Sequence, residues 1–479
     1  MKTLLVFLAS LLISGREIQK VQTAPQTANL NTVFVGFHEG TTDAQRQEAV
    51  GFIGEWVESA HHYEYIPTLS LLRLTPEGMD RMEEVNALVA THPSVQYTEA
   101  DAVFTATTSE VIPNDSGFPQ CWGHRNTGSG GGLVNFDMNT TNAWSITKGS
   151  PTIKILVFET GIQQDHPDIN QLPGRDFTTG AVSGVAGGGP SNACDNHGTA
   201  VAGCISGIIN NSIGTVGVAP DCKVISAKVG TAITPCSGSW QGQTSWTVNA
   251  INWAIGNGVR VTNNSNDYGT PSTSMTNAYT AARNAGVVNF ASSGNSGNTT
   301  IGYPASASSV NAVGASSRNG QRANFSSYGN KLAFVAAGQS IYTTDRTGSA
   351  GYGAGDYTTI DGTSFSSPYA AGVAALILSV KPSLSAAEVE SVMRSTCKEM
   401  GASGFDTLTG WGMLDADAAV RAVLPQPCPA DLTGDRSVNG DDLGRLLSAW
   451  GTPTADLTGD SVVDGSDLGR LLAAWGVCP

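Results

Sequence analysis

Basic residues are scarce in this 479-residue chain, which has 25 Lys and Arg against 40 Asp and Glu and a formal net charge of −15. A nucleic-acid-binding surface needs clustered basic side chains to neutralise phosphates, so the composition argues against that class of function. Charged residues make up only 14% of the chain, below the roughly 25% typical of soluble domains. With 57 glycines and 40% apolar residues, we expect a loop-rich globular protein with a large core.

Long hydrophobic runs are also lacking. The run from Leu4 to Ile13 follows Lys2 and is too short to span a bilayer, but it is typical of a secretory signal. We therefore assign residues 1–24 to a signal peptide and expect a secreted, extracellular protein. The alternative is a buried N-terminal strand. We expect no transmembrane segment after the signal.

No C-x-x-C pair occurs among the eight cysteines, which argues against a zinc cluster. An even number of cysteines behind a signal peptide favours disulfides, although eight cysteines allow 105 pairings. One pairing is suggested by position, because Cys428 and Cys478 bracket the last acidic segment of the chain.

That segment, residues 426–479, contains a repeat with a period of 25 residues that starts at Ala430 and again at Ala455. Oxygen-bearing side chains at loop positions 1, 3, 5, 9 and 12 predict two loops that each wrap a Ca²⁺ ion, and an apolar helix follows each loop. The alternative is a pair of Asp-rich turns that bind nothing. The predicted ligands are Asp431, Thr433, Asp435, Asn439 and Asp442 in the first copy, and Asp456, Thr458, Asp460, Asp464 and Asp467 in the second.

These loops depart from an EF-hand, because Arg436 and Ser461 stand where Gly is usual and position 12 is Asp instead of Glu. A duplicated loop and helix with Asp at position 12 resembles dockerin modules. The resemblance implies structural Ca²⁺ and a cohesin-like or cell-surface partner for residues 426–479.

Residues 25–110 are predicted to form a small α+β domain. Strand-like segments at 31–37, 70–74 and 94–104 alternate with two helical stretches, and Pro76 and Glu77 fit the first turn of the second helix. The order β-α-β-α-β favours a ferredoxin-like fold. A flexible stretch at 105–117 then leads into residues 111–425.

The middle domain, residues 111–425, alternates apolar strands with helices, and several strands end in polar, Gly-rich turns. This pattern predicts an α/β fold with a parallel sheet flanked by helices on both faces, and polar loops at the carboxyl ends of the strands build the site in such sheets. The informative segments are IKILVFETGI at 153–162, DNHGTAVAGCISGII at 195–209, NNSNDYG at 263–269, ASSGNSG at 291–297 and DGTSFSSPYAAGVAALILSV at 361–380.

In these segments the chain resembles the subtilisin-like serine peptidases from about Pro113 to Ala422. The motifs HGTAVAG, ASSGNSG and GTSFSSPYAAGVAAL match that family's His, Asn and Ser signatures in the order acid, His, Ser. The resemblance implies a serine endopeptidase that acts on protein or peptide substrates through an acyl-enzyme. It assigns Glu159 as the acid, His197 as the base, Ser364 as the nucleophile and Asn295 as the oxyanion donor.

The chemistry requires these residue types. A Ser hydroxyl is a poor nucleophile until a base takes its proton, and a His near neutrality does this and later protonates the leaving amine. A carboxylate on the other ring nitrogen holds the tautomer and stabilises the imidazolium. An Asn side chain adds a donor for the developing oxyanion.

The same resemblance implies three further features. Residues 25–110 match the family's inhibitory propeptide, to be removed by a cut near residues 105–116. A calcium loop at 210–220 would use Asn211, carbonyls of Ile209, Ile213 and Thr215, and the carboxylate of Asp168, while Asp115 matches a calcium-binding position of the thermitase-like members. The alternative is a plain Asn/Gly turn. The walls of the specificity pocket would be Ser265, Asp267, Gly269, Ser292, Ser293 and Gly294.

Asn266 and Asp267 are unusual in that wall, because family members commonly have an apolar residue and Gly there. Asp267 would favour a basic substrate residue or would point to solvent. Both alternatives remain open at this point.

The main departure from the family is Glu159, where the family has Asp; Ala200 also replaces a His outside the triad. Glu159 leaves two interpretations: an active endopeptidase, or an impaired peptidase fold that serves as a binding or scaffold protein through its C-terminal module. The retention of Ser364, His197 and Asn295 favours the first. A carbohydrate-acting enzyme, which the dockerin-like segment suggests, would need paired carboxylates at a recognisable site, and the sequence has none.

Overall fold

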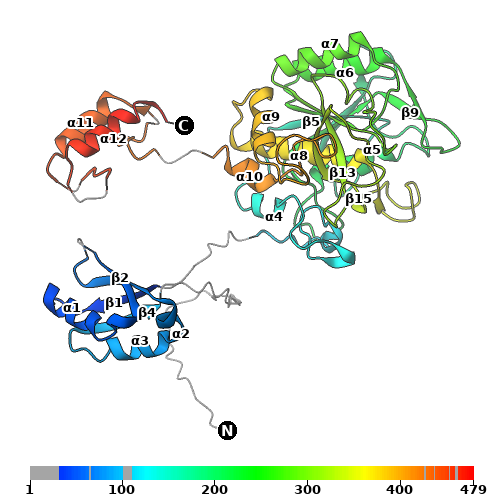
Figure 1. Ribbon diagram of the computed structural model, residues 1–479. Coiled ribbons are helices and arrows are strands. Elements are labelled where there is room, and N and C mark those ends of the chain that lie inside the picture. The colour runs from blue at the N-terminus through cyan, green and yellow to red at the C-terminus, as the bar shows by residue number, and fades with distance from the viewer. Residues whose placement is uncertain are drawn as a thin grey trace, which may run out of the picture. The chain divides into compact units, whose positions relative to one another are not determined.

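The computed structural model describes residues 32–63, 66–100, 110–424, 428–435, 437–452, 454–458 and 462–478 (Figure 1). The chain divides into two compact units, Met1–Thr107 and Thr108–Pro479. The expected signal peptide at 1–24 lies outside the described residues.

The N-terminal unit contains a four-stranded antiparallel sheet with the order β2-β3-β1-β4. Alternate residues of β1 and β3, such as Val33, Val35 and Leu72, point into its core. The elements are β1 (Thr32–Phe37), α1 (Asp43–Gly51), a 3₁₀ turn (Gly54–Trp56), β2 (Val57–His62), β3 (Leu69–Leu74), α2 (Pro76–Asp80), α3 (Met82–Val89) and β4 (Val95–Ala100).

The predicted order β-α-β-α-β lacked β2 and was wrong in that respect. The sequence of β2, VESAHH, has no apolar residue at alternate positions, and none of its side chains is fully buried. An exposed edge strand of this kind leaves no periodic signal.

The middle domain is built on an eight-stranded sheet with the order β14-β13-β12-β11-β5-β8-β6-β7. All neighbouring strands are parallel except β6 and β7, so the prediction of a wholly parallel sheet is corrected to a mostly parallel one. The two residues of β7 are exposed and carry no apolar pattern. The strands are β5 (Lys154–Glu159), β6 (Gln171–Asp176), β7 (Val185–Ala186), β8 (Lys223–Lys228), β11 (Val261–Asn264), β12 (Val288–Ser292), β13 (Asn311–Ser316) and β14 (Leu332–Ala337).

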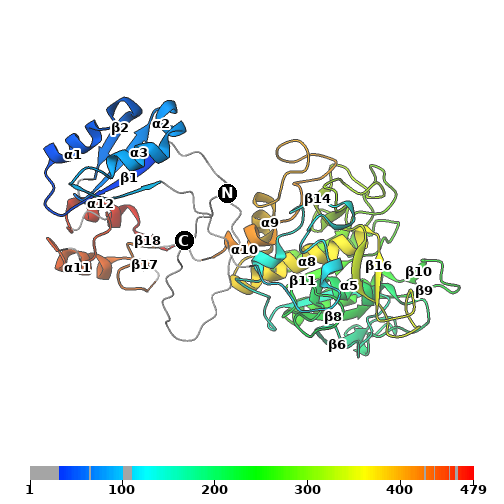
Figure 2. The ribbon, with the colours of Figure 1, turned by 90° about the horizontal axis from the view of Figure 1, so that it is seen from below.

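Helices cover both faces of this sheet, as predicted. Helices α5 (His197–Ser206) and α8 (Thr363–Val380) pack against each other and against the strands, while α6 (Thr244–Gly256) and α7 (Thr273–Asn284) form a second pair (Figures 1 and 2). The remaining elements are short 3₁₀ turns (Phe118–Gln120, Ser129–Gly131), α4 (Thr140–Ala143), the hairpin β9 (Gly230–Ala232) and β10 (Trp240–Gly242), the hairpin β15 (Ile341–Thr344) and β16 (Tyr357–Ile360), α9 (Ala386–Ser395) and α10 (Ala416–Arg421).

Helix α8 is the one helix in the described part of the chain that is long and apolar enough to cross a membrane. It runs through the centre of the domain, and 89% of it is buried there. A buried core helix accounts for this composition. The expectation that long hydrophobic runs are lacking after the signal is therefore corrected for α8.

The C-terminal segment folds around its own small core, which includes Val438, Leu446, Val463 and Leu471. Helices α11 (Gly440–Ser448) and α12 (Gly465–Ala473) follow the two acidic loops, and β17 (Ser437–Val438) pairs with β18 (Gly476–Val477).

Two disulfides occur among the described residues, Cys194–Cys236 and Cys428–Cys478. The second is the pair that its position had suggested. The other four cysteines are unpaired, so the even count overstated the number of disulfides. Three of them, Cys121, Cys204 and Cys222, are buried and serve as small apolar side chains.

Candidate active site

Glu159 and His197 meet at the carboxyl end of the central strand. Glu159 is the last residue of β5, and His197 is the first residue of α5. Oε1 of the fully buried Glu159 lies 2.8 Å from Nδ1 of His197. Burial disfavours the imidazolium, but the charge and hydrogen bond of Glu159 outweigh burial, so the pKa of His197 is raised above its ordinary value.

Polar contacts on both sides hold these two residues in place. The buried Asn266 donates from Nδ2 to the carbonyl of Phe158, one residue before Glu159, over 2.8 Å. The buried Lys228 donates to the carbonyl of Thr160 over 3.0 Å and lies 3.4 Å from Asp195, two residues before His197. The buried ion pair between Lys228 and Asp195 therefore connects the end of β5 with the start of α5.

Ser364 is the second residue of α8, and Gly362 precedes the helix with a φ of 154° that favours glycine. The Ser364 hydroxyl donates to the carbonyl of Ser265 over 3.1 Å, and the Ser265 hydroxyl donates to the carbonyl of Ser364 over 2.7 Å. These reciprocal bonds fix the start of α8 to the end of β11. His197 packs against Phe365, with ring centroids 5.8 Å apart.

Asn295 follows the end of β12 and is oriented by Thr363. Its Oδ1 accepts from the amide and from the hydroxyl of Thr363, both over 2.9 Å. Its Nδ2 has no hydrogen-bond partner among the described residues, so the amide group is free to donate. No sequence pattern indicated that Thr363 would orient this side chain.

These residues share one cavity of about 560 Å³, which Glu159, His197, Asn295 and Ser364 all line. The hairpin β9–β10 contributes Trp240, and the Cys194–Cys236 disulfide lies in the same wall. The disulfide joins that hairpin to a position three residues before His197, a contact that no sequence pattern predicted.

A second cavity, of about 280 Å³, also opens beside Ser364 and Asn295. Four of the predicted wall residues line it: Ser265, Asp267, Ser292 and Gly294. The sequence analysis missed Asn298, Thr300, Gly302 and Ser327, which also line it together with Ser296.

Gly269 and Ser293 do not line this cavity. Ser293 is fully buried, and its hydroxyl donates to the carbonyl of Ser327, so its side chain points into the protein. The amide of Gly269 donates to Asp267 in a turn beyond the wall.

The predicted calcium loop brings Asp115 and Asp168 to the same short segment. Asp115 accepts from the amides of Asn210 and Asn211, while Asp168 accepts from Nδ2 of Asn211 over 2.6 Å and from the amide of Thr215 over 3.0 Å. Burial raises the pKa of Asp168 to about 6, against the opposing effect of these hydrogen bonds.

The backbone of this loop is curled. Asn210, Ser212 and Gly214 have positive φ values of 61°, 68° and 56°. The carbonyls of Ile209, Ile213 and Thr215 accept no hydrogen bond from the described residues. Unpaired carbonyls beside two carboxylates are suitable oxygen ligands for Ca²⁺, so the residues present fit this ion.

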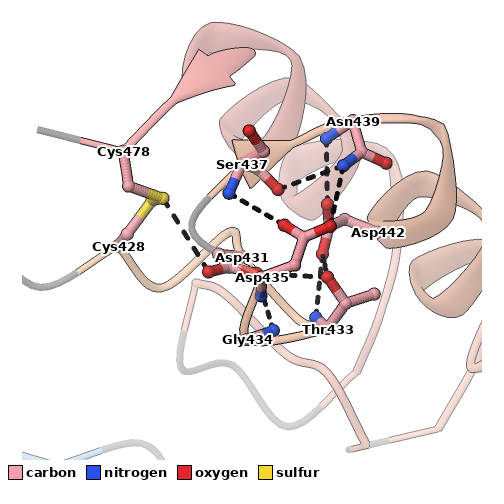
Figure 3. The surroundings of a disulfide bond; sticks show 9 residues. All are labelled: Cys428, Asp431, Thr433, Gly434, Asp435, Ser437, Asn439, Asp442 and Cys478. Carbon is pink, nitrogen blue, oxygen red and sulfur yellow. Dashed lines mark hydrogen bonds between the residues drawn. A yellow bond between two sulfur atoms is a disulfide. The ribbon is translucent and has the colours of Figure 1, made fainter.

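The first loop of the C-terminal segment gathers three carboxylates, as Figure 3 shows. Carboxylate oxygens of Asp431, Asp435 and Asp442 all lie within 4.8 Å of one another. The Thr433 hydroxyl lies 3.0 Å from Asp442, and Asn439 caps α11 and donates to Asp435.

In the second loop, the Thr458 hydroxyl lies 3.2 Å from Asp456, and the Thr458 amide donates to Asp467 over 2.9 Å. Asp464 caps α12. Asp460 lies outside the described residues. The three carboxylates of the first loop, which lie within 4.8 Å of one another, fit a hard cation.

Comparison with known proteins agrees with this geometry. Residues 150–412, more than half of the chain, match the subtilase family. The chain belongs to the subtilase family. The family assignment and the serine endopeptidase class inferred from the three motifs are thereby confirmed.

Individual relatives are similar over long stretches. This subtilase is 34% identical over 365 residues to an alkaline protease of Alkalihalobacillus alcalophilus, covering 76% of this chain and 82% of the relative. It is 38% identical over 269 residues to subtilisin Savinase of Lederbergia lenta, covering 56% of this chain and 91% of the relative. A solved structure of proteases from Pseudoalteromonas arctica PAMC 21717 is 29% identical, with a TM-score of 0.56, and the match covers 65% of this chain and 99% of that structure.

Proposed function

We propose that this subtilase is a secreted serine endopeptidase that hydrolyses peptide bonds through an acyl-enzyme on Ser364, with Glu159 in the role that Asp has in relatives. The observation that carries the proposal is the 2.8 Å contact between Oε1 of Glu159 and Nδ1 of His197, in the cavity that Ser364 and Asn295 also line. Glu keeps the charge and both oxygens, so it sets the same imidazole tautomer as Asp.

The steps follow from these positions. The Ser364 hydroxyl rotates away from the Ser265 carbonyl, loses its proton to Nε2 of His197, and Oγ bonds to the carbonyl carbon of the substrate. Nδ2 of Asn295 donates to the resulting oxyanion. His197 then gives the proton to the leaving amine as the C–N bond breaks, and a water molecule, deprotonated by His197, hydrolyses the ester and frees Ser364.

A fluorophosphonate probe tests this function on the mature protein. We expect the parent to be labelled and Ser364→Ala to be silent. His197→Ala should be labelled at least about 10²-fold more slowly, because the base that activates the hydroxyl is missing. A folded parent that is neither labelled nor active on any peptide contradicts the proposal and favours a binding or scaffold role.

Residues 25–110 are proposed to be an inhibitory propeptide, so that the enzyme is made as a zymogen. The proposal is supported by the separate core of this unit and its place before the catalytic domain.

Structural Ca²⁺ is proposed at the 209–215 loop and at the two C-terminal loops. Bound Ca²⁺ would neutralise buried carboxylates and fix loop conformation, with no part in the bond-breaking steps. For the 209–215 loop, Asp168→Asn should lower the resistance to heat inactivation in Ca²⁺ by several degrees and remove the difference between Ca²⁺ and chelator. A chelator effect that persists in this variant assigns the ion elsewhere.

The C-terminal segment 426–479 is proposed to attach the enzyme to a cohesin-like or cell-surface protein. Each repeat exposes one Leu and one Trp at equivalent positions. In the first copy these are Leu447 in α11 and Trp450 shortly after it, and in the second copy they are Leu472 in α12 and Trp475 shortly after it. The recurrence of the same two large exposed side chains in both copies supports an interaction role for the segment. Extracellular location follows from the proposed signal peptide at 1–24.

A further inference from the structure

The smaller cavity at Ser364 has an unusual lining. Every residue that lines its roughly 280 Å³ is Ser, Thr, Asn, Gly or Asp, so no aliphatic or aromatic side chain faces it. Asp267 is the only ionisable residue among them. Because this cavity adjoins Ser364 and Asn295 but not Glu159 and His197, it lies beside the attacked carbonyl and away from the base.

The Asp267 carboxylate lies against Gly302, which lines the same cavity. A Cβ atom placed on Gly302 would lie 2.6 Å from Oδ2 of Asp267, so the absence of a side chain at Gly302 makes room for the carboxylate. Oδ1 accepts from the amide of Gly269 over 2.8 Å. Oδ2 has no hydrogen-bond or ion-pair partner among the described residues, so it is available to a ligand.

We infer that Asp267 makes this enzyme select Lys or Arg as the residue that supplies the attacked carbonyl. The inference rests on the proposed function, in which Ser364 attacks that carbonyl. The residue that supplies the attacked carbonyl carries its side chain on the Cα atom, which is bonded directly to the carbonyl carbon. That side chain therefore enters the cavity beside Ser364. A cation there meets the free Oδ2, whereas an apolar side chain meets only polar walls that lose water without gaining a partner.

The alternative role of Asp267 is purely local. Its Oδ1 closes a turn with the Gly269 amide, and Asp and Asn close such turns equally well. Asp267→Asn therefore retains the turn and removes the charge. This substitution separates a specificity role from a structural one.

The experiment compares kcat/KM for peptide amides that are identical except for Arg, Lys, Gln, Leu or Phe before the scissile bond, after titration of active sites with a fluorophosphonate. We expect Arg and Lys to exceed Gln, Leu and Phe by roughly tenfold or more in the parent. Asp267→Asn should reduce the Arg-to-Gln ratio by about tenfold.

Asp221→Asn is the matched control, because it removes one negative charge from an exposed position before the amino end of β8, at the opposite edge of the sheet. Its Arg-to-Gln ratio should equal that of the parent. The ratio of the parent should also fall in 1 M salt, since an exposed charge pair is screened.

Each outcome has one meaning. A labelled parent with no preference for Arg and Lys, or a preference that Asp267→Asn leaves intact, overturns the inference and leaves the proposed function standing. A parent that is neither labelled nor active on any peptide overturns the proposed function, and the inference fails with it. The preference and salt dependence of the parent decide the matter if the variant does not fold.

Discussion

Gly198 lies directly against the side-chain stem of Glu159. A Cβ atom placed on Gly198 would come within 2.8 Å of Cβ and 3.1 Å of Cγ of Glu159, and within 2.4 Å of the carbonyl oxygen of Gly161. Because His197 is the preceding residue, this contact sets how closely the first turn of α5 approaches the end of β5. The fit of the longer Glu side chain therefore depends on Gly198.

Gly198→Ala should displace Glu159 relative to His197 and lower kcat by about 10², because a misplacement of about 1 Å costs that much in a preorganised site. The displacement follows from the 2.4 Å approach to backbone, which cannot move aside as a flexible side chain does. The measurement is kcat at saturating peptide, with the folded fraction checked by thermal unfolding.

Gly256→Ala is the control for this change. Gly256 is the exposed last residue of α6, and a Cβ there would meet nothing within 4 Å. Its activity should equal that of the parent, and its stability should rise by about 0.5–1 kcal/mol. Full activity in Gly198→Ala would show that the Gly198 contact does not position the catalytic pair.

Glu159→Gln should abolish most activity. The amide cannot offset the imidazolium charge and favours the wrong tautomer, a fault that costs about 10⁴ in turnover in serine proteases. Glu159→Asp keeps the charge but shortens the side chain by one methylene, so we expect a change of roughly tenfold or less, and a loss if the site has adapted to Glu.

Activity on peptides, measured as kcat and kcat/KM separately, checks both variants. If Glu159→Gln cleaves peptides as fast as the parent, Glu159 does not orient His197. The enzyme would then work with a Ser364–His197 dyad.

The pH profile should report the raised pKa of His197. The base must be neutral, so kcat/KM should fall as the pH drops through the pKa of His197, with a midpoint above the ordinary 6.5. Glu159→Gln removes the charge that stabilises the imidazolium, so its residual activity should have its midpoint at lower pH. If the midpoint is the same in the variant, another group controls the fall of kcat/KM at low pH.

Maturation should depend on the nucleophile. We expect active enzyme to begin near residues 105–116, after removal of the 25–110 unit, and Ser364→Ala purified alone to accumulate as uncut precursor. N-terminal sequencing and mass measurement distinguish the two forms. Normal maturation of purified Ser364→Ala would mean that another protease makes the cut.

The C-terminal loops should become ordered on binding Ca²⁺. Asp431, Asp435 and Asp442 repel one another without a cation, so a chelator should loosen 428–478 in the full-length protein. Hydrogen exchange of this segment with and without Ca²⁺ measures the effect, and Asp431→Ala combined with Asp456→Ala should abolish it. Asp441→Ala is the control, because Asp441 is exposed in the first turn of α11 and outside the ligand positions. Exchange that ignores Ca²⁺ would show that these loops bind no ion.

Local patterns in the sequence determined much of this protein. The apolar strands ending in Glu159 and Asn264, the small-residue helix that starts at His197, and the helix that starts near Ser364 follow from periodicity and composition, which depend on neighbouring residues alone. The acidic repeat and the Cys428–Cys478 pair were visible for the same reason, since the period and the bracketing are features of the chain itself.

Only the tertiary structure decided the contacts that join distant segments. The Cys194–Cys236 bond, the Lys228–Asp195 ion pair and the approach of Asp267 to Gly302 each bring together segments that lie more than 30 residues apart in the chain. Loops at the carboxyl ends of parallel strands carry no periodicity, because their conformation is set by what they pack against. For that reason the sequence left two alternatives open for Asp267, and only the fold shows that its carboxylate lies against Gly302.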